Sequence, residues 1–380
     1  MSGKNNPLLG FQKTNCGFSG SGFCFCRINI AKQSEQVYNE SVIPSRINGK
    51  RRNNSMLKKG ELVSFRPDIK VVDCTLRDGG LVNNFFFTDD FVKDLYQCNI
   101  RSGIDYMEFG YKASKEQFDT DKFGKWKFCN DDDIYNIVGD NDTGLKIAVM
   151  ADVGRTDFRQ DIIDKANSPI DMVRVATYIN TIPSALEIVE YCNKKGYETS
   201  INIMAVSKSN DMDLDDALEL IGRSCVDNIY IVDSYGSLYP EQMRRYAEKY
   251  LNIADKYNKR IGIHAHNNQQ LAFANTIETL TMGVSYLDST VSSLGRGAGN
   301  CPTELLLGFL KNPKYHISPL LSFIEKHIVP LREEGLIWGY DIPYLLTGRL
   351  NQHPRDAIRF SQDKRTDYKD FYHFLFDKDI

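Results

Sequence analysis

From Ile69 onward, eight short apolar runs alternate with amphipathic stretches, and this alternation restricts the fold more than any other feature of the sequence. Strands that alternate with helical segments indicate a parallel sheet, because neighbouring parallel strands need a crossover that is usually a helix. Eight such units predict an α/β fold, a closed (β/α)8 TIM barrel. We expect its strands at Ile69–Thr75, Tyr106–Gly110, Lys146–Ala151, Met172–Ala176, Thr199–Ala205, Asn228–Val232, Arg260–His264 and Tyr286–Asp288.

Helices are expected between these strands, although the segment after Lys146–Ala151 shows no clear helical pattern. An open doubly wound sheet is the competing fold, but no G-x-G-x-x-G fingerprint follows the first strand, so the barrel is favoured. The expected helices are Asp89–Ser102, Asp131–Val138, Thr181–Lys195, Asp213–Ser224, Tyr239–Tyr257, Gln270–Met282 and Thr303–Leu310.

Two further regions flank the barrel, which we expect to occupy residues 68–312. Residues 1–67 hold 11 Lys and Arg against 3 Asp and Glu and show no periodicity, which predicts a disordered basic leader. An organellar transit segment is an alternative, but a dispensable tail or a true start at Met56 is favoured. Residues 313–380 are rich in apolar and aromatic residues, which predicts a small helical extension packed on the barrel.

Composition and charge exclude several classes of protein. No run of about 18 apolar residues occurs, so no membrane-spanning helix is expected. The net charge of −3 provides no broad basic field for a nucleic acid partner. The nine cysteines are an odd number, are scattered, and follow no recognisable signal peptide, which predicts reduced thiols and a cytoplasmic protein.

The first candidates for a site lie where the first expected strand ends, because TIM barrels carry their functional side chains at the C-terminal ends of the strands. Asp73, Arg77 and Asp78 stand there, and charged groups leaving a buried strand are costly without partners. For Asp73, a barrel-closing salt bridge and a site role are about equally expected. For Arg77 and Asp78 a site role is favoured, because Gly79 and Gly80 follow and let a ligand approach closely.

The seventh expected strand ends with two of the six histidines of the chain, His264 and His266. Residues i and i+2 of an extended strand point to the same side, with Cα atoms roughly 6.5–7 Å apart. Two imidazoles so placed can bind one metal ion at about 2.1 Å each. A lone histidine is more often a packed core residue, but this pair, with a carboxylate able to join from the first strand, favours metal binding.

A glycine-rich loop follows the eighth expected strand, where residues 295–300 read Gly-Arg-Gly-Ala-Gly-Asn. Such a loop can close over a ligand and presents N–H groups to anions, so Gly297 and Gly299 are candidates for substrate contact. A flexible connection without function is the alternative. Asn300 can add an amide oxygen to the two imidazoles and the carboxylate. This donor set lacks a thiolate and suits Mg²⁺, Mn²⁺ or Zn²⁺.

A metal ion with open positions beside Arg77 is matched to a small 2-oxo acid. The metal ion and Arg77 would together stabilise the negative charge that develops when the carbonyl group of this acid becomes an enolate. The sequence therefore points to carbon–carbon bond chemistry next to a ketone.

The chain resembles the DRE-TIM metallolyase superfamily, the pyruvate carboxyltransferase-like barrels, in three motifs taken in order. These are Leu76-Arg77-Asp78-Gly79, His264-Ala265-His266-Asn267 and Gly295-Arg296-Gly297-Ala298-Gly299-Asn300. The likeness runs from about residue 69 to about residue 360, and it is closest to the 4-hydroxy-2-oxovalerate aldolases. Taken together and in this order, the three motifs are specific for the superfamily.

The resemblance implies roles for individual residues. Asp78, His264 and His266 are expected to bind a divalent ion, usually Mn²⁺ or Mg²⁺. Asn300 is expected as a fourth ligand, as in the related acyl-CoA lyases. The resemblance also assigns Arg77 to the substrate carbonyl and its enolate.

A C-terminal segment with the sequence Trp-Gly-Tyr-Asp-Ile-Pro-Tyr resembles the part of the aldolases that lends a tyrosine to the site. Tyr340 is the first choice for this catalytic tyrosine and Tyr344, as a substrate contact, is the second. Arg174 and Ser234 follow or end other strands, and they are expected either to contact substrate or to serve in packing and barrel closure.

One departure from the aldolases concerns proton transfer. They carry a catalytic histidine two residues after the Asp-Gly pair, whereas residues 80–84 of this chain read Gly-Leu-Val-Asn-Asn. The substitute bases that we consider are Glu108 and Tyr111, Asp233, or a metal-bound water. Lys112 could form a Schiff base, but an exposed loop lysine is favoured.

The sequence thus predicts a divalent-metal-dependent lyase that cleaves a 4-hydroxy-2-oxo acid to pyruvate and an aldehyde. The alternatives are a transferase that condenses an acyl-CoA with a 2-oxo acid, a barrel that has lost its chemistry and serves in binding, and a ferrous oxygenase. A homodimer is expected. An acylating aldehyde dehydrogenase, which accompanies the known aldolases, is a candidate partner.

Overall fold

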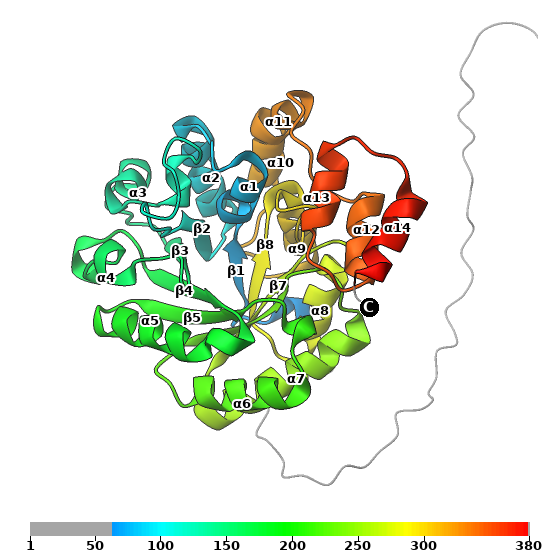
Figure 1. Ribbon diagram of the computed structural model, residues 1–380. Coiled ribbons are helices and arrows are strands. Elements are labelled where there is room, and N and C mark those ends of the chain that lie inside the picture. The colour runs from blue at the N-terminus through cyan, green and yellow to red at the C-terminus, as the bar shows by residue number, and fades with distance from the viewer. Residues whose placement is uncertain (1–62, 379–380) are drawn as a thin grey trace, which may run out of the picture. The chain divides into compact units, whose positions relative to one another are not determined.

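The computed structural model describes residues 63–378, and within them eight parallel strands form a closed barrel in sequence order (Figure 1). β1 pairs with β2 on one side and with β8 on the other, which closes the sheet. The predicted TIM barrel is therefore confirmed. The strands are β1 Lys70–Asp73, β2 Tyr106–Tyr111, β3 Lys146–Asp152, β4 Met172–Thr177, β5 Glu198–Ile203, β6 Asn228–Asp233, β7 Arg260–Ala265 and β8 Tyr286–Ser289.

Helices surround the barrel, and each expected helix is present within a few residues of its predicted bounds (Figure 1). The connection after β3, which lacked a clear pattern, holds only the four-residue helix α4, Phe158–Asp161. The others are α2 Asp89–Ser102, α3 Asp131–Val138, α5 Ile182–Lys194, α6 Asp211–Gly222, α7 Pro240–Tyr257, α8 Ala272–Met282 and α9 Thr303–Phe309.

The first strand differs most from its prediction, because it ends at Asp73 and the helix α1, Thr75–Asn83, begins almost at once. The carboxylate of Asp73 accepts hydrogen bonds from the backbone N–H and the hydroxyl of Thr75, which fixes this abrupt start. Arg77 and Asp78 therefore lie on a helix and not in a loop.

The expected role of the two glycines of α1 is also wrong. A Cβ atom on Gly79 would lie 2.8 Å from Cγ of Leu294, and one on Gly80 would lie 2.1 Å from the Phe85 ring. Glycine is required here by close packing of protein side chains, since no larger residue fits without displacing them. The glycines thus bring α1 close to its neighbours instead of making room for a ligand.

The C-terminal residues are helical, as predicted (Figure 1). α10, Ser318–Phe323, packs on α2, where the rings of Phe91 and Phe323 lie 5.1 Å apart. A π-helical turn, Ile324–Ile328, leads into α11, Val329–Glu333. Three further helices form a small apolar cluster of their own with residue 298 of the glycine-rich loop: α12 Ile342–Arg349, α13 Arg355–Gln362 and α14 Tyr368–Asp377.

Several sequence predictions are only partly open to test. The leader falls almost wholly on residues 1–62, which lie outside the described residues, while residues 63–65 form a single 3-10 turn. The domain bounds at 68–312 and 313–380 stay predictions. All six cysteines among residues 63–378 are free thiols, and no helix in this range is long and apolar enough to span a membrane.

The interior of the barrel is filled by side chains and supports the site from below. Aromatic and aliphatic residues of the strands pack in its lower part, among them Tyr106, Tyr230 and Tyr286. Above them the interior becomes charged, with the fully buried Arg174 lying over the ring of Tyr230 at 4.5 Å. The functional groups described next stand on this charged layer.

Candidate metal centre and active site

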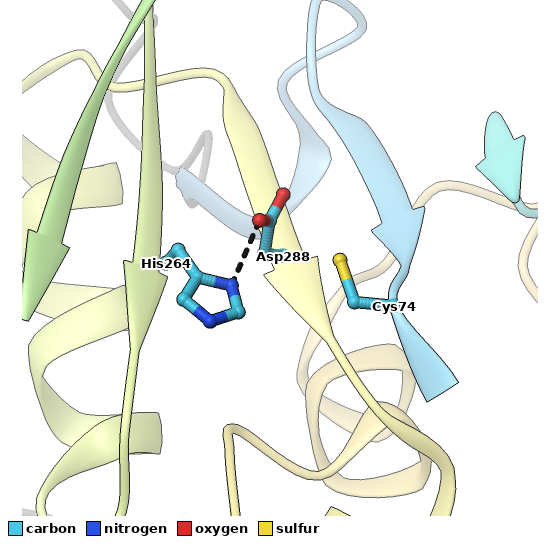
Figure 2. A group of neighbouring side chains, drawn as sticks. All are labelled: Cys74, His264 and Asp288. Carbon is cyan, nitrogen blue, oxygen red and sulfur yellow. Dashed lines mark hydrogen bonds and ion pairs between the residues drawn. The ribbon is translucent and has the colours of Figure 1, made fainter. Parts of the chain in front are cut away.

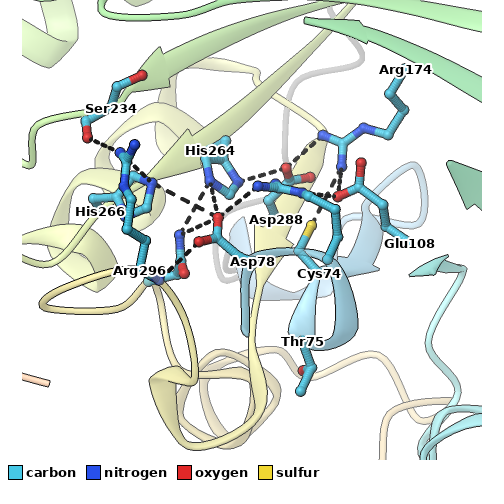
Figure 3. Close-up of polar contacts among 12 residues, drawn as sticks. Cys74, Thr75, Asp78, Glu108, Arg174, Ser234, His264, His266, Asp288 and Arg296 are labelled. Carbon is cyan, nitrogen blue, oxygen red and sulfur yellow. Dashed lines mark hydrogen bonds and ion pairs between the residues drawn. The ribbon is translucent and has the colours of Figure 1, made fainter. Parts of the chain in front are cut away.

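Asp78, His264 and His266 converge at the C-terminal end of the barrel (Figure 3). Their candidate ligand atoms all lie within 4.8 Å of one another. Oδ2 of Asp78 is 3.1 Å from Nε2 of His264 and 3.8 Å from Nε2 of His266. All three side chains are at least 95% buried. The strand spacing of the two histidines places their rings 5.2 Å apart, on the same side, as the sequence predicted.

Asn300 joins this group from the glycine-rich loop. Its Nδ2 atom lies 3.2 Å from Nε2 of His264 and 3.4 Å from Oδ2 of Asp78. A backbone bridge between Asn300 and His266 holds the loop against the end of β7. Oδ1 of Asn300 is buried and has no hydrogen-bond partner. The amide nitrogen faces the imidazole and the carboxylate here, and a half-turn of the amide would place the oxygen, the end that a hard divalent cation prefers, in the same position.

Electrostatics keep Asp78 and His266 in the protonation states that a metal requires, whereas His264 would have to lose a proton to bind one. Burial opposes ionisation of Asp78, but the charges of Arg77 and the two histidines hold its pKa well below the ordinary value. Burial lowers the pKa of His266 far below its usual range, so that its imidazole is neutral. Burial also opposes the charge on His264, yet hydrogen bonds to Asp288 and Asp78 raise its pKa.

A closed ring of alternating charges supports these groups (Figure 3). Arg77 donates to Asp78 and to Glu108 at 2.8 Å each. Arg174 donates to the same oxygen of Glu108 at 2.9 Å and, on its other side, to Asp288 at 2.5 Å. The ring closes because Oδ2 of Asp288 contacts Nδ1 of His264 at 2.9 Å. Each buried charge therefore has an opposite charge beside it, which is what burial demands.

Cys74, His264 and Asp288 form a second group of candidate ligands, but their contacts indicate a supporting role (Figure 2). Figure 2 shows the hydrogen bond that already occupies Nδ1 of His264. Burial and nearby carboxylates raise the pKa of Cys74 well above its ordinary value, so its thiol stays protonated and is a poor ligand. Asp288 instead orients the imidazole so that Nε2 faces Asp78.

A cavity of about 60 Å³ opens beside the candidate metal ligands Asp78, His264, His266 and Asn300, which we call the metal-ligand group. Its size fits a molecule of a few heavy atoms, and its wall combines charged groups with apolar side chains. The polar residues that line it are Arg77, Asp78, Tyr111, Asn202, Ser234, His264, His266 and Arg296.

Some predicted residues are not brought to this cavity. Tyr340 is 47% exposed and does not line it, and Tyr344 is buried against Gly297. The carboxylate of Asp233 turns away and accepts the N–H groups of residues 237 and 238. Lys112 is buried and paired with Asp131, so the prediction of an exposed lysine is wrong.

Other predicted residues support the cavity without lining it. Glu108 and Arg174 lie beneath it in the ring of charges. Gly297 and Gly299 have left-handed backbone angles, with φ of 62° and 76°, and shape the loop that carries Asn300. The carbonyl of Gly299 accepts the N–H of Asn267, which secures the loop to the segment after β7.

Two charged residues of the site were not assigned a role from the sequence. Arg296 lines the cavity, and its Nη2 atom donates to the carbonyl of Ser234 at 2.7 Å. Asp288 orients His264, as described above. Both stand in the stretch around the eighth strand end, so their position at the barrel mouth was the signal that could have identified them.

Most of the chain is similar to known proteins. Residues 68–324 match the HMGL-like family. The 4-hydroxy-2-oxovalerate aldolase of Bacillus cereus is 27% identical over 313 residues, covering 80% of this chain and 89% of the relative. The oxaloacetate decarboxylase of Mycobacterium tuberculosis is 30% identical over 250 residues, covering 63% of this chain and 69% of the relative.

A solved structure is also similar along most of the chain. The N-terminal domain of a Bacteroides vulgatus protein superposes with a TM-score of 0.65 at 27% identity, covering 77% of this chain and 96% of that domain. The family predicted from the three motifs is confirmed by the match over residues 68–324, which contains the metal-ligand group and the glycine-rich loop. The chain therefore belongs to the HMGL-like family.

Proposed function

We propose that the protein is a divalent-metal-dependent lyase that cleaves a 4-hydroxy-2-oxo acid to pyruvate and an aldehyde, or forms it in reverse. One observation carries this proposal: the donor atoms of Asp78, His264 and His266 lie within 4.8 Å of one another beside a cavity that Arg77 also lines. The similarity to proteins named 4-hydroxy-2-oxovalerate aldolase supports the choice of reaction.

The metal would be held by Asp78, His264, His266 and Asn300. The ligand types favour Mn²⁺ or Mg²⁺, with Zn²⁺ as a further candidate. Such an ion supplies Lewis acidity toward the 2-oxo group and the carboxylate of the substrate. The neutral imidazole of His266 and the ionised Asp78 are in the states that ligation needs.

Arg77 is the candidate for stabilising the enolate oxygen. Its guanidinium is 5% exposed and is fixed by Asp78 and Glu108, so it does not have to reorganise when charge develops on the substrate. The same two carboxylates outweigh the effect of burial and raise its pKa, which keeps the group cationic.

Tyr111 is the candidate for proton transfer, in place of the histidine that the aldolases have. Among the described residues that line the cavity, only Tyr111 and Ser234 carry a hydroxyl group. The hydroxyl oxygen of Ser234 accepts a hydrogen bond from the N–H of Ala205, and an aliphatic hydroxyl is a weaker acid than a phenol, so Tyr111 is favoured. Burial raises the pKa of Tyr111 to about 12, so it is protonated at neutral pH and suited to donate a proton to C3 of the enolate.

The test combines metal analysis with two reactions. Purified protein should retain or take up Mn²⁺ or Mg²⁺, catalyse exchange of the C3 protons of pyruvate with deuterium, and release pyruvate from 4-hydroxy-2-oxo acids. Asp78→Asn should abolish all three properties. Wild-type protein that binds no divalent ion and exchanges no C3 protons would contradict the proposal.

Decarboxylation of a 3-carboxy-2-oxo acid is the second candidate reaction. It is favoured because no carboxylate or imidazole outside the metal-ligand group lines the cavity among residues 63–378. Loss of CO₂ needs no base to remove a hydroxyl proton, whereas aldol cleavage does. A protein that consumes oxaloacetate but cleaves no 4-hydroxy-2-oxo acid would favour this candidate over the first.

The remaining parts of the proposal concern the setting of the enzyme. We expect a cytoplasmic homodimer, which light scattering of the purified protein can test. An aldehyde dehydrogenase partner would be found by co-purification. Release of free CoA from acetyl-CoA in the presence of 2-oxo acids would indicate the condensing transferase instead.

A further inference from the structure

The cavity contains a positive charge that no acidic group of the described chain balances. Arg77 and Arg296 both line the cavity, but only Arg77 is paired with carboxylates, at 2.8 Å from Asp78 and from Glu108. Among residues 63–378, no Asp or Glu forms an ion pair with Arg296. Its Nη2 atom donates to the carbonyl of Ser234 at 2.7 Å and lies 3.4 Å from Nε2 of His266.

The guanidinium of Arg296 is also incompletely hydrogen-bonded. Its Nε atom is buried and has no partner. A buried N–H donor on a charged group that lacks a hydrogen-bond partner destabilises the protein, and a bound ligand can remove this cost. A carboxylate is the matching ligand, because a guanidinium presents five N–H groups in a planar fork. The unpaired charge and the unused donor belong to the same side chain, which lines the small cavity.

The surrounding loop holds Arg296 in place. Its backbone N–H donates to Oδ1 of Asp78 at 3.0 Å, which ties the residue to the metal-ligand group. Gly295 is required beside it, since a Cβ atom there would lie 2.0 Å from Oδ1 of Asn300. Figure 3 shows the side chain reaching from this loop toward Ser234 on the β6 side of the barrel mouth. The charge is thus fixed at the side of the cavity opposite Arg77's anchor, Glu108.

We propose that Arg296 binds a second carboxylate of the substrate, so that the enzyme prefers dianionic 2-oxo acids to 2-oxo monoacids. This inference rests on the proposed lyase function, because the first carboxylate and the 2-oxo group are assigned to the metal and Arg77. A monoacid would leave the charge of Arg296 unbalanced, whereas a 2-oxo acid with a carboxylate at its far end would pair with it.

The space around the cavity is consistent with such a substrate. The cavity of about 60 Å³ holds only a short chain. A second hollow of about 340 Å³ has Met204 in common with the cavity as a lining residue. No acidic residue lines that hollow, and Lys208, which does line it, forms no ion pair with a carboxylate among the described residues.

Binding of two unreactive compounds of equal length tests the inference without turnover. 2-Oxopentanedioate and 2-oxopentanoate differ only in the terminal carboxylate, and neither has a bond that the proposed lyase breaks. Titration calorimetry of the Mn²⁺-loaded protein should show tighter binding of the diacid by roughly 10- to 100-fold, the range of a charge-assisted bidentate pair. Arg296→Leu should bring this ratio close to one, and Arg296→Lys should give an intermediate ratio.

The control is Arg101→Leu, which removes one positive charge from the last turn of α2 on the outside of the barrel and should leave the ratio unchanged. Equal binding of the two compounds by wild-type protein, or a ratio that survives in Arg296→Leu, overturns the inference. Kinetics then separate the two proposals. A protein that prefers the diacid in binding but cleaves neither 4-hydroxy-2-oxopentanedioate nor 4-hydroxy-2-oxopentanoate would refute the lyase function while the assignment of Arg296 stands.

Discussion

Asp288 and His264 are joined by a hydrogen bond of 2.9 Å that leaves the opposite nitrogen of the imidazole facing Asp78 at 3.1 Å. The carboxylate on β8 thus determines how a ring on β7 presents the nitrogen that is the candidate metal ligand. Carboxylates that hold metal-ligating histidines in this way are part of the site in function, although they do not touch the ion.

Asp288→Asn is expected to weaken Mn²⁺ binding by about 10- to 100-fold, because the amide holds the imidazole less firmly and lowers its basicity. The measurement is a metal titration by calorimetry. Asp142→Asn, which changes an exposed acid on the connection between α3 and β3, serves as the matched control and should bind Mn²⁺ like the wild type. Equal affinity in both variants would show that Asp288 serves only the ion pair with Arg174.

Tyr111→Phe is expected to slow the exchange of pyruvate C3 protons by about 10²-fold or more, because the variant lacks the proposed proton donor. Consumption of oxaloacetate should fall much less, since the carbon–carbon bond breaks before C3 is protonated. Deuterium incorporation by NMR and oxaloacetate absorbance measure the two rates. Tyr340→Phe alters a tyrosine that does not line the cavity and should change neither rate. A larger effect in Tyr340→Phe than in Tyr111→Phe would restore the assignment expected from the resemblance.

Gly295→Ala is expected to lower metal affinity, because its Cβ atom would lie 2.0 Å from Oδ1 of Asn300 and 3.2 Å from Oδ1 of Asp78. The loop must then move away from both side chains. Gly308→Ala, in α9, meets no atom within 4 Å and should be neutral or stabilising by about 0.5–1 kcal/mol. Metal titration and urea unfolding of the two variants give the comparison. Unchanged Mn²⁺ affinity in Gly295→Ala would argue against Asn300 as a ligand.

Asp73 should make stability depend on pH. Burial raises its pKa to about 6, from 3.8, although Thr75 and Asn99 donate hydrogen bonds to it. Its folded-state pKa lies above the unfolded one, so its contribution is fully favourable below about pH 4 and is lost as the pH rises through 6. Relative to Asp73→Asn, the wild type should lose on the order of 3 kcal/mol of unfolding free energy between pH 4 and pH 7. Urea unfolding at several pH values measures this difference, and a constant difference would contradict the prediction.

The sequence was sufficient for the barrel and for the meeting of Asp78, His264 and His266 at its mouth, whereas their role as metal ligands stays a prediction. Strand periodicity alone places His264 and His266 on one side of β7, and the order of the strands brings the end of β1 beside the end of β8. Local pattern and topology point to the same arrangement here, which is why the prediction succeeded.

Other features depend on contacts between distant residues and could not be predicted. α1 begins directly after β1 although it contains two glycines, because packing against Leu294 and Phe85 outweighs their low helix propensity. The position of Tyr340 depends on the path of the segment after α11, where the N–H of Gly339 donates to the carbonyl of Gly297. The pairing of Arg174 with Asp288 crosses the barrel interior, which no local pattern reveals.

The metal-ligand group draws its members from both ends of the barrel sequence. Asp78 stands in the first βα unit and Asn300 follows the last strand, 222 residues later, where β1 and β8 meet. A cation bound there would link the first and last βα units where β1 pairs with β8 and would thereby stabilise the closed barrel. Metal binding and folding of the barrel would then be coupled in this protein. A shortage of the ion in a cell would lower the stability of the closed barrel as well as the activity.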